Sequence, residues 1–163
     1  AKFDPSLAMI LFVCTGSEAN DQALRITRGH TGKQGIICTN LTYHGNTTAV
    51  DAISPLFYAP DAPAHREVST IASPDSYRAP AGLAGSVLTD HYIEQLQAAI
   101  NRLEASGVGF AGLMLCTIFA NEGLPDVPPG SDRVQSNDVT MDDRGLIYLL
   151  DRVRGLHILE RIG

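Results

Sequence analysis

An uninterrupted apolar run, followed by a short turn and an amphipathic segment, constrains the fold more than any other feature. The run is Met9–Cys14, the turn is 15–17, and the amphipathic segment is 18–30. An apolar stretch of this length is typical of a strand buried on both faces of a parallel sheet. A second short apolar run, 35–39, follows the helix. The pattern therefore predicts a β-α-β unit over residues 9–39 with a right-handed crossover.

Further along the chain the same alternation continues. Residues 66–71 are strand-like, 90–106 form an amphipathic helix with apolar residues every three or four positions, and 110–118 form a third apolar strand. The strand-like residues 66–71 lie within a long proline-rich segment, 54–85, that precedes the helix 90–106. We therefore expect an α/β fold, a three-layer sandwich with a mostly parallel sheet, over about residues 9–120.

The C-terminal part, 131–163, has a different pattern. Two short apolar runs, 146–150 and 156–159, are separated by a turn near Gly155 with no helix between them. Such spacing predicts a β-hairpin and does not continue the β-α-β pattern. We therefore expect two parts, 1–130 and 131–163, of different origin.

Composition excludes several classes of protein. The chain has 163 residues, 12 Lys+Arg and 18 Asp+Glu, and a formal net charge of -6, which argues against nucleic acid as a partner. No apolar run approaches the roughly 20 residues that span a bilayer, so no membrane association is expected. The three cysteines, 14, 38 and 116, lack C-x-x-C spacing. They indicate a reducing, cytoplasmic environment and no metal site.

The turn 15–17 is a candidate anion site. A strand-to-helix turn brings free backbone N–H groups and the positive end of a helix dipole to one point. Gly16 would allow close approach of a phosphate, and the Ser17 hydroxyl could donate to it or cap the helix. There is no Walker loop and no G-x-G-x-x-G pattern. The alternative is an ordinary strand-to-helix turn with a serine cap.

Three runs in the first part resemble the class III pyridoxal-phosphate (PLP) aminotransferases. They are CTGSEANDQALR at 14–25, TYHGN at 42–46 and NEGLPDVPPG at 121–130. Any one of them alone is weak evidence, whereas the three occur in the order found in the family across residues 9–130. The resemblance implies part of the large domain of such an enzyme.

The resemblance also implies roles for individual residues. Gly16 and Ser17 match the positions that hold the cofactor phosphate, Tyr43 matches the aromatic residue that stacks on the pyridine ring, and His44 completes the same turn. A flat ring needs an aromatic face and its phosphate needs a helix N-terminus. The alternatives are a half-buried structural tyrosine and a surface turn histidine.

The departures from the family concern the chemistry itself. Family members carry an acidic residue where this chain has Cys116 followed by Thr117. They also carry a later carboxylate for the ring nitrogen and the lysine that forms the Schiff base. The lysines here, Lys2 and Lys33, match neither position. No catalytic residue is therefore assigned, and it is open whether the chain is an enzyme.

Two hypotheses about function follow. In the first, the chain is aminotransferase-like and binds PLP non-covalently through its phosphate, without turnover on its own; it either only binds the cofactor or catalyses together with a partner chain that supplies the missing lysine. In the second, it is a non-catalytic, self-associating relic or fusion protein with a vestigial anion site. A sheet cut off in this way exposes an edge and apolar helix faces, so we expect a homodimer in either case.

The C-terminal part has a resemblance of its own. The runs 137–152 and 155–159 look like one repeat of a β-propeller-type protein. A single repeat cannot bury its own faces. The alternative is a divergent hairpin that merely shares turn chemistry with such repeats.

Overall fold

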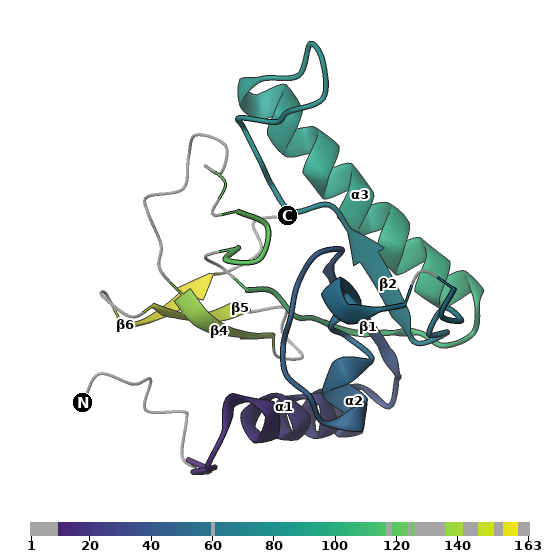
Figure 1. Cartoon of the computed structure of the whole chain (residues 1–163), viewed down its shortest axis with the longest axis vertical. Coiled ribbons are helices and arrows are strands. Elements are labelled where there is room, and N and C mark those ends of the chain that lie inside the picture. Colours follow the sequence, from purple (N-terminus) through teal and green to yellow (C-terminus); the bar gives the residue numbers. More distant parts are fainter. Residues whose placement is uncertain are drawn as a thin grey trace.

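The computed structural model describes residues 10–59, 61–116, 119–123 and 125, together with the backbones of three C-terminal strands. Two three-stranded sheets and three α-helices make up these residues (Figure 1). In chain order the elements are α1 Gly16–Thr31, β1 Gly35–Thr39, α2 Thr48–Asp51, the 3-10 helix η1 Pro55–Phe57, β2 Val68–Ile71, α3 Gly85–Ala105, β3 Phe110–Leu113, β4 Ser136–Met141, β5 Ile147–Asp151 and β6 Gly155–Leu159.

The first sheet is parallel and has the strand order β2-β1-β3. All residues of the central strand β1 are buried, as its apolar sequence predicts. Because side chains alternate across a strand, Ile36 and Cys38 pack against α1 and α2, whereas Ile37 packs against α3. The α/β fold class with a parallel sheet between two helix layers is confirmed.

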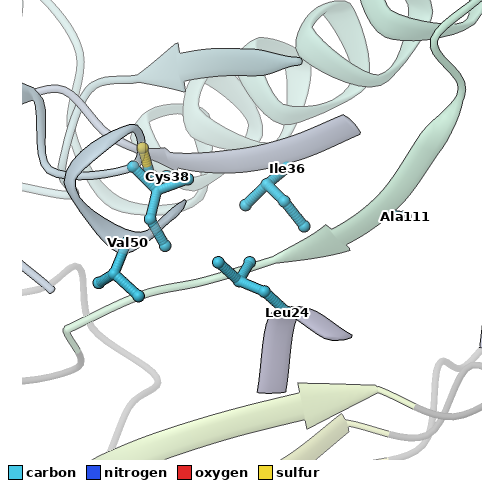
Figure 2. Packing of buried hydrophobic residues seen from close by; sticks show 6 residues of the cluster. Leu24, Ile36, Cys38, Val50 and Ala111 are labelled. Atoms are coloured by element: carbon cyan, nitrogen blue, oxygen red, sulfur yellow. The ribbon is translucent and has the colours of Figure 1, made fainter. Parts of the chain in front are cut away.

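The larger core cluster lies between the sheet and helices α1 and α2. Leu24 of α1 and Val50 of α2 meet Ile36, Cys38 and Ala111 of the sheet there (Figure 2). All five side chains are at most a few per cent exposed. The cluster therefore fixes α1 and the start of α2 against β1, and these are the elements that border the candidate site.

The second sheet is antiparallel and has the order β4-β5-β6. Strands β5 and β6 form the expected hairpin, with Asp151 opposite Gly155 at its closed end. Strand β4 pairs with β5 and adds a third strand that the sequence pattern did not predict. Of these strands only the backbone is described.

The expected first strand, 9–14, is wrong over its described residues. Residues 10–13 form no strand, and their side chains are exposed, Phe12 to 89%. β1 already has β2 and β3 on its two sides, and residues 10–13 pair with neither of these. The expected β-α-β unit therefore lacks its first strand in the described structure, in which α1 is the first element. Met9 lies outside the described residues.

Other boundaries differ by a few residues. Helix α3 begins at Gly85, five positions before the expected start, and β3 ends at Leu113 rather than continuing to 118. None of the helices within the described ranges combines the length and apolar character that crossing a membrane requires.

Candidate functional site

Helix α1 begins with a complete capping box. The Thr15 hydroxyl accepts a 3.1 Å hydrogen bond from the Glu18 backbone N–H, and Glu18 Oε2 accepts from the backbone N–H groups of Cys14, at 2.7 Å, and Thr15, at 3.2 Å. The N-cap is therefore Thr15, and the expectation that Ser17 caps the helix is wrong. Glu18 takes up two of the donors that converge at this helix end.

Two backbone donors remain at the start of α1. Within the described part of the chain, the N–H groups of Gly16 and Ser17 have no hydrogen-bond partner. A Cβ atom on Gly16 would meet nothing within 4 Å, so open space lies beside them. These donors are available to an anion, although the Glu18 carboxylate at the same helix end opposes one electrostatically.

The hydroxyl of Ser17 connects α1 to the turn 42–46. It donates to Asn46 Oδ1 at 3.1 Å and accepts from the Asn46 backbone N–H at 3.2 Å. Asn20 strengthens the connection by donating from Nδ2 to the His44 carbonyl at 2.6 Å. A Cβ on Gly45 would lie 2.5 Å from Ser17 Oγ, and Gly45 has a φ of +144°. Only glycine permits so close an approach here.

Tyr43 lies on the same turn with its ring partly open to solvent. Its side chain is 41% exposed, and the ring of Phe57 from η1 contacts it edge-on at a centroid distance of 5.1 Å and an interplanar angle of 89°. Edge-to-face contact fixes the orientation of an aromatic ring while leaving surface for stacking. The structure thus joins Ser17, at the start of α1, to the turn that carries Tyr43.

His44 is oriented differently, because its ring is half-buried and turned toward the protein. Nε2 lies 3.2 Å from the buried hydroxyl of Thr42, and the backbone N–H of His44 donates to Ser54 Oγ at 3.0 Å. Burial lowers the pKa of the ring to about 4, against the opposing effect of a hydrogen bond to the backbone of Met114. The ring is therefore neutral at pH 7 and braces the turn.

One buried acidic residue was missed by the sequence analysis. Glu122, in the loop after β3, is 3% exposed, and its Oε1 accepts a 2.6 Å hydrogen bond from the hydroxyl of Thr39, the last residue of β1. Its Oε2 is buried and has no hydrogen-bond partner among the described residues. Burial, and secondarily the charge of Glu122, raises the pKa of the Cys38 thiol to about 12. An acidic residue shortly after a buried strand is the signal that could have identified it.

Lys33, the lysine that lies within the described residues, is at the opposite edge of the sheet from the turn 42–46. Lys33 precedes β1, at the amino ends of the strands, and its Nζ is paired with Glu104 at 2.7 Å. Residues 40–46 follow β1 at its carboxyl end. Cys116, where the family has an acidic residue, is a free, half-buried thiol. Lys2 and Thr117 lie outside the described residues.

No family model matches the chain. Among curated proteins, it is 31% identical over 149 residues to glutamate-1-semialdehyde 2,1-aminomutase 1 of Macrococcus caseolyticus. That match covers 91% of this chain and 32% of the relative, so the chain spans about a third of the relative's length. A match of this extent reaches into residues 131–163, and the likeness of that part to a β-propeller repeat finds no support.

Solved structures agree with this relationship. A phospholyase from Arthrobacter, in complex with phosphoethanolamine, superimposes with a TM-score of 0.69 and 35% identity over 79% of this chain and 30% of the phospholyase. The taurine:2-oxoglutarate aminotransferase of Bifidobacterium kashiwanohense, in complex with PLP and glutamate, superimposes with a TM-score of 0.56 over 72% of this chain and 27% of that enzyme. At 20% identity, this second structure shows the fold alone. The relatives similar in sequence are therefore an aminomutase and a phospholyase, and the fold is that of a fragment of a PLP-dependent transferase.

Proposed function

We propose that this chain is part of an aminotransferase-type enzyme and holds the phosphate of PLP at the start of α1. The observation that carries the proposal is the pair of unpartnered N–H groups of Gly16 and Ser17 beside open space. A helix N-terminus with free donors favours a phosphate through hydrogen bonds and through the helix dipole. The relationship to PLP-binding homologues makes PLP the phosphate-bearing ligand to test first.

The residues beside these donors fit the rest of the cofactor. Tyr43 offers a partly exposed ring, oriented by Phe57, on which a pyridine ring can stack. The Ser17–Asn46 hydrogen bonds join the start of α1 to the turn that carries this ring. His44 supports the turn through contacts within the protein: its ring nitrogen lies beside the Thr42 hydroxyl and its backbone N–H donates to Ser54. When bound, PLP supplies an electron sink for reactions at the carbon that carries an amino group.

We further propose that this chain alone has no amino-transfer activity. PLP enzymes need a lysine amine at the cofactor and a carboxylate at the ring nitrogen. Lys33 is held by Glu104 at the amino edge of the sheet, away from residues 40–46. Cofactor-dependent amino transfer by the purified chain, abolished by Tyr43→Ala, would overturn this part of the proposal.

The binding site is tested by titrating the chain with PLP while recording amide NMR signals. We expect shifts confined to residues 15–19 and 43–46 and their loss in Gly16→Val, which fills the open space beside the donors. Gly29→Val is the matched control, because it makes the same change in the same helix, also with nothing within 4 Å. The absence of shifts between Thr15 and Ala19 would favour the alternative, a vestigial site.

We also propose that the chain self-associates and forms two units, 1–130 and 131–163. Exposed apolar side chains support association, among them Ile10 at 67%, Leu11 at 65% and Phe12 at 89%. Separate parallel and antiparallel sheets support the division into units. Light scattering that shows a monomer at micromolar concentration would contradict the self-association.

We propose further that the protein is cytoplasmic and does not bind nucleic acid. The three free cysteines suit a reducing compartment, and the net charge of -6 disfavours binding to a phosphate backbone.

A further inference from the structure

A cavity of about 450 Å³ lies at the amino edge of the parallel sheet, away from the turn 42–46. Residues that come just before the three strands line it, together with the ends of α1 and α3. Its lining residues are Arg28, Gly32, Gln34, Arg66, Glu67, Gly107 and Val108. The volume is in the range of cavities that take small metabolites.

Two arginines from different elements line this cavity. Arg28, in the last turn of α1, donates from Nε to the Gln34 carbonyl at 3.2 Å, and Arg66, before β2, donates from a terminal nitrogen to the Ser106 carbonyl at 2.9 Å. Each guanidinium is thereby fixed through one nitrogen. Because a guanidinium carries five donors, each arginine keeps further N–H groups for a ligand.

Neither arginine is neutralised by an acidic partner. The ion pairs within the described residues are Lys33–Glu104 and Arg78–Asp75. The one acidic residue of the lining, Glu67, forms no ion pair with either arginine. The two guanidinium groups therefore outweigh the single carboxylate, which leaves a local positive charge on a chain of net charge -6.

We propose that this cavity binds a small oxyanion, the carboxylate or phosphate group of a metabolite-sized molecule. Guanidinium groups match the paired oxygens of these ions through bidentate hydrogen bonds. The partial negative charge at the C-terminal ends of α1 and α3 opposes an anion, and of the two arginine contacts only that of Arg66 is to a capping carbonyl, that of Ser106. Binding therefore depends on the guanidinium groups. Glu67 lowers the affinity, since its negative charge faces the same cavity. The proposal is independent of PLP binding, because the two sites lie at opposite edges of the sheet.

The experiment measures amide NMR shifts of Gly32, Gly107 and Val108 during separate titrations with acetate and with inorganic phosphate. Sodium chloride at matched ionic strength is the control for charge alone. Saturable shifts with acetate, with phosphate or with both support the proposal and identify which oxyanion binds. Shifts with chloride that equal those with both oxyanions, or no saturable shift with either, overturn it.

Three substitutions locate the interaction. Arg28→Gln and Arg66→Gln should each weaken binding by about fivefold or more, whereas Glu67→Gln should strengthen it. Arg25→Gln is the matched control, since it removes the same charge from α1 at a residue outside the lining. Equal effects of Arg25→Gln and Arg28→Gln would show a non-specific charge effect and overturn the proposal. If an Arg→Gln variant fails to fold, the opposite sign expected for Glu67→Gln still decides it.

Discussion

The hydroxyl of Thr39 donates a 2.6 Å hydrogen bond to Oε1 of Glu122, which joins the end of β1 to the loop after β3. Arg78 holds the same loop from its other side by donating to the Glu122 carbonyl at 2.7 Å, and Arg78 is itself paired with the buried carboxylate of Asp75 at 2.6 Å. Residues 119–123 are therefore fixed beside the carboxyl end of β1, where the turn 42–46 begins.

The first prediction concerns this hydrogen bond. Thr39→Val removes the hydroxyl and leaves both oxygens of the buried Glu122 carboxylate without a partner among the described residues. The free energy of unfolding should therefore fall by about 1–3 kcal/mol. In a Glu122→Ala background the same substitution should cost much less, because the acceptor is already gone. Urea unfolding of the four proteins in this cycle measures the coupling. Additive effects would show that the two groups do not stabilise each other.

The second prediction concerns the close approach between Gly45 and Ser17. Gly45→Ala should destabilise the chain by more than 1 kcal/mol, because the new Cβ would lie 2.5 Å from Ser17 Oγ at a φ of +144°. Gly16→Ala is the control, with nothing within 4 Å and a helical backbone, and should be neutral or slightly stabilising. Thermal unfolding compares them. Equal melting temperatures for the two variants would contradict the close packing.

Sequence reasoning predicted the parallel sheet well, because the buried strand β1 and the amphipathic helix α3 both have periodicity that local pattern reveals. It failed for residues 10–13, since an apolar run does not say whether neighbouring strands are there to pair with it. It also placed the cap on Ser17 rather than Thr15, because both residue types suit an N-cap and only the bond to Glu18 decides between them.

The candidate site was predictable only in part. The strand-to-helix pattern indicated the turn 15–17 as a candidate, whereas Tyr43 was a candidate only through the resemblance to the aminotransferases. The Thr39–Glu122 contact joins residues far apart in the chain: the burial of β1 was predictable, whereas no local pattern pairs Glu122 with Thr39. The inward orientation of the His44 ring depends on its contacts with Thr42 and the backbone of Met114, which tertiary packing alone determines.

The third prediction concerns acid stability. Burial lowers the pKa of His44 from 6.5 to about 4, so the folded state binds this proton less readily than the unfolded state. The contribution of the neutral His44 ring to the free energy of unfolding is fully present above pH 6.5. It is lost as the pH falls below 6.5 and through about 4, by up to roughly 3 kcal/mol in total. His44→Gln should flatten this dependence, whereas His30→Gln, at an exposed position, should not. Urea unfolding between pH 4 and 7 measures it; identical slopes for wild type and His44→Gln would refute the assignment.

The last prediction separates helix capping from anion binding at α1. Glu18 Oε2 accepts from Cys14 and Thr15, and its negative charge lies at the helix end where the Gly16 and Ser17 donors are free. Glu18→Gln keeps an acceptor oxygen but removes the charge. The chain should therefore lose about 0.5–1 kcal/mol of stability, because a neutral amide interacts more weakly with the helix dipole than a carboxylate does.

The same substitution should raise the affinity for PLP and for inorganic phosphate several-fold at low salt, and the gain should shrink as salt is added. Asp21→Asn is the matched control, because it removes an equal charge one turn further into α1, outside the capping box. Isothermal titration of both variants gives the comparison, with urea unfolding for stability. If Asp21→Asn raises the affinity as much as Glu18→Gln, only the net charge matters. An affinity that Glu18→Gln leaves unchanged would mean that the anion does not bind at the Gly16 and Ser17 donors.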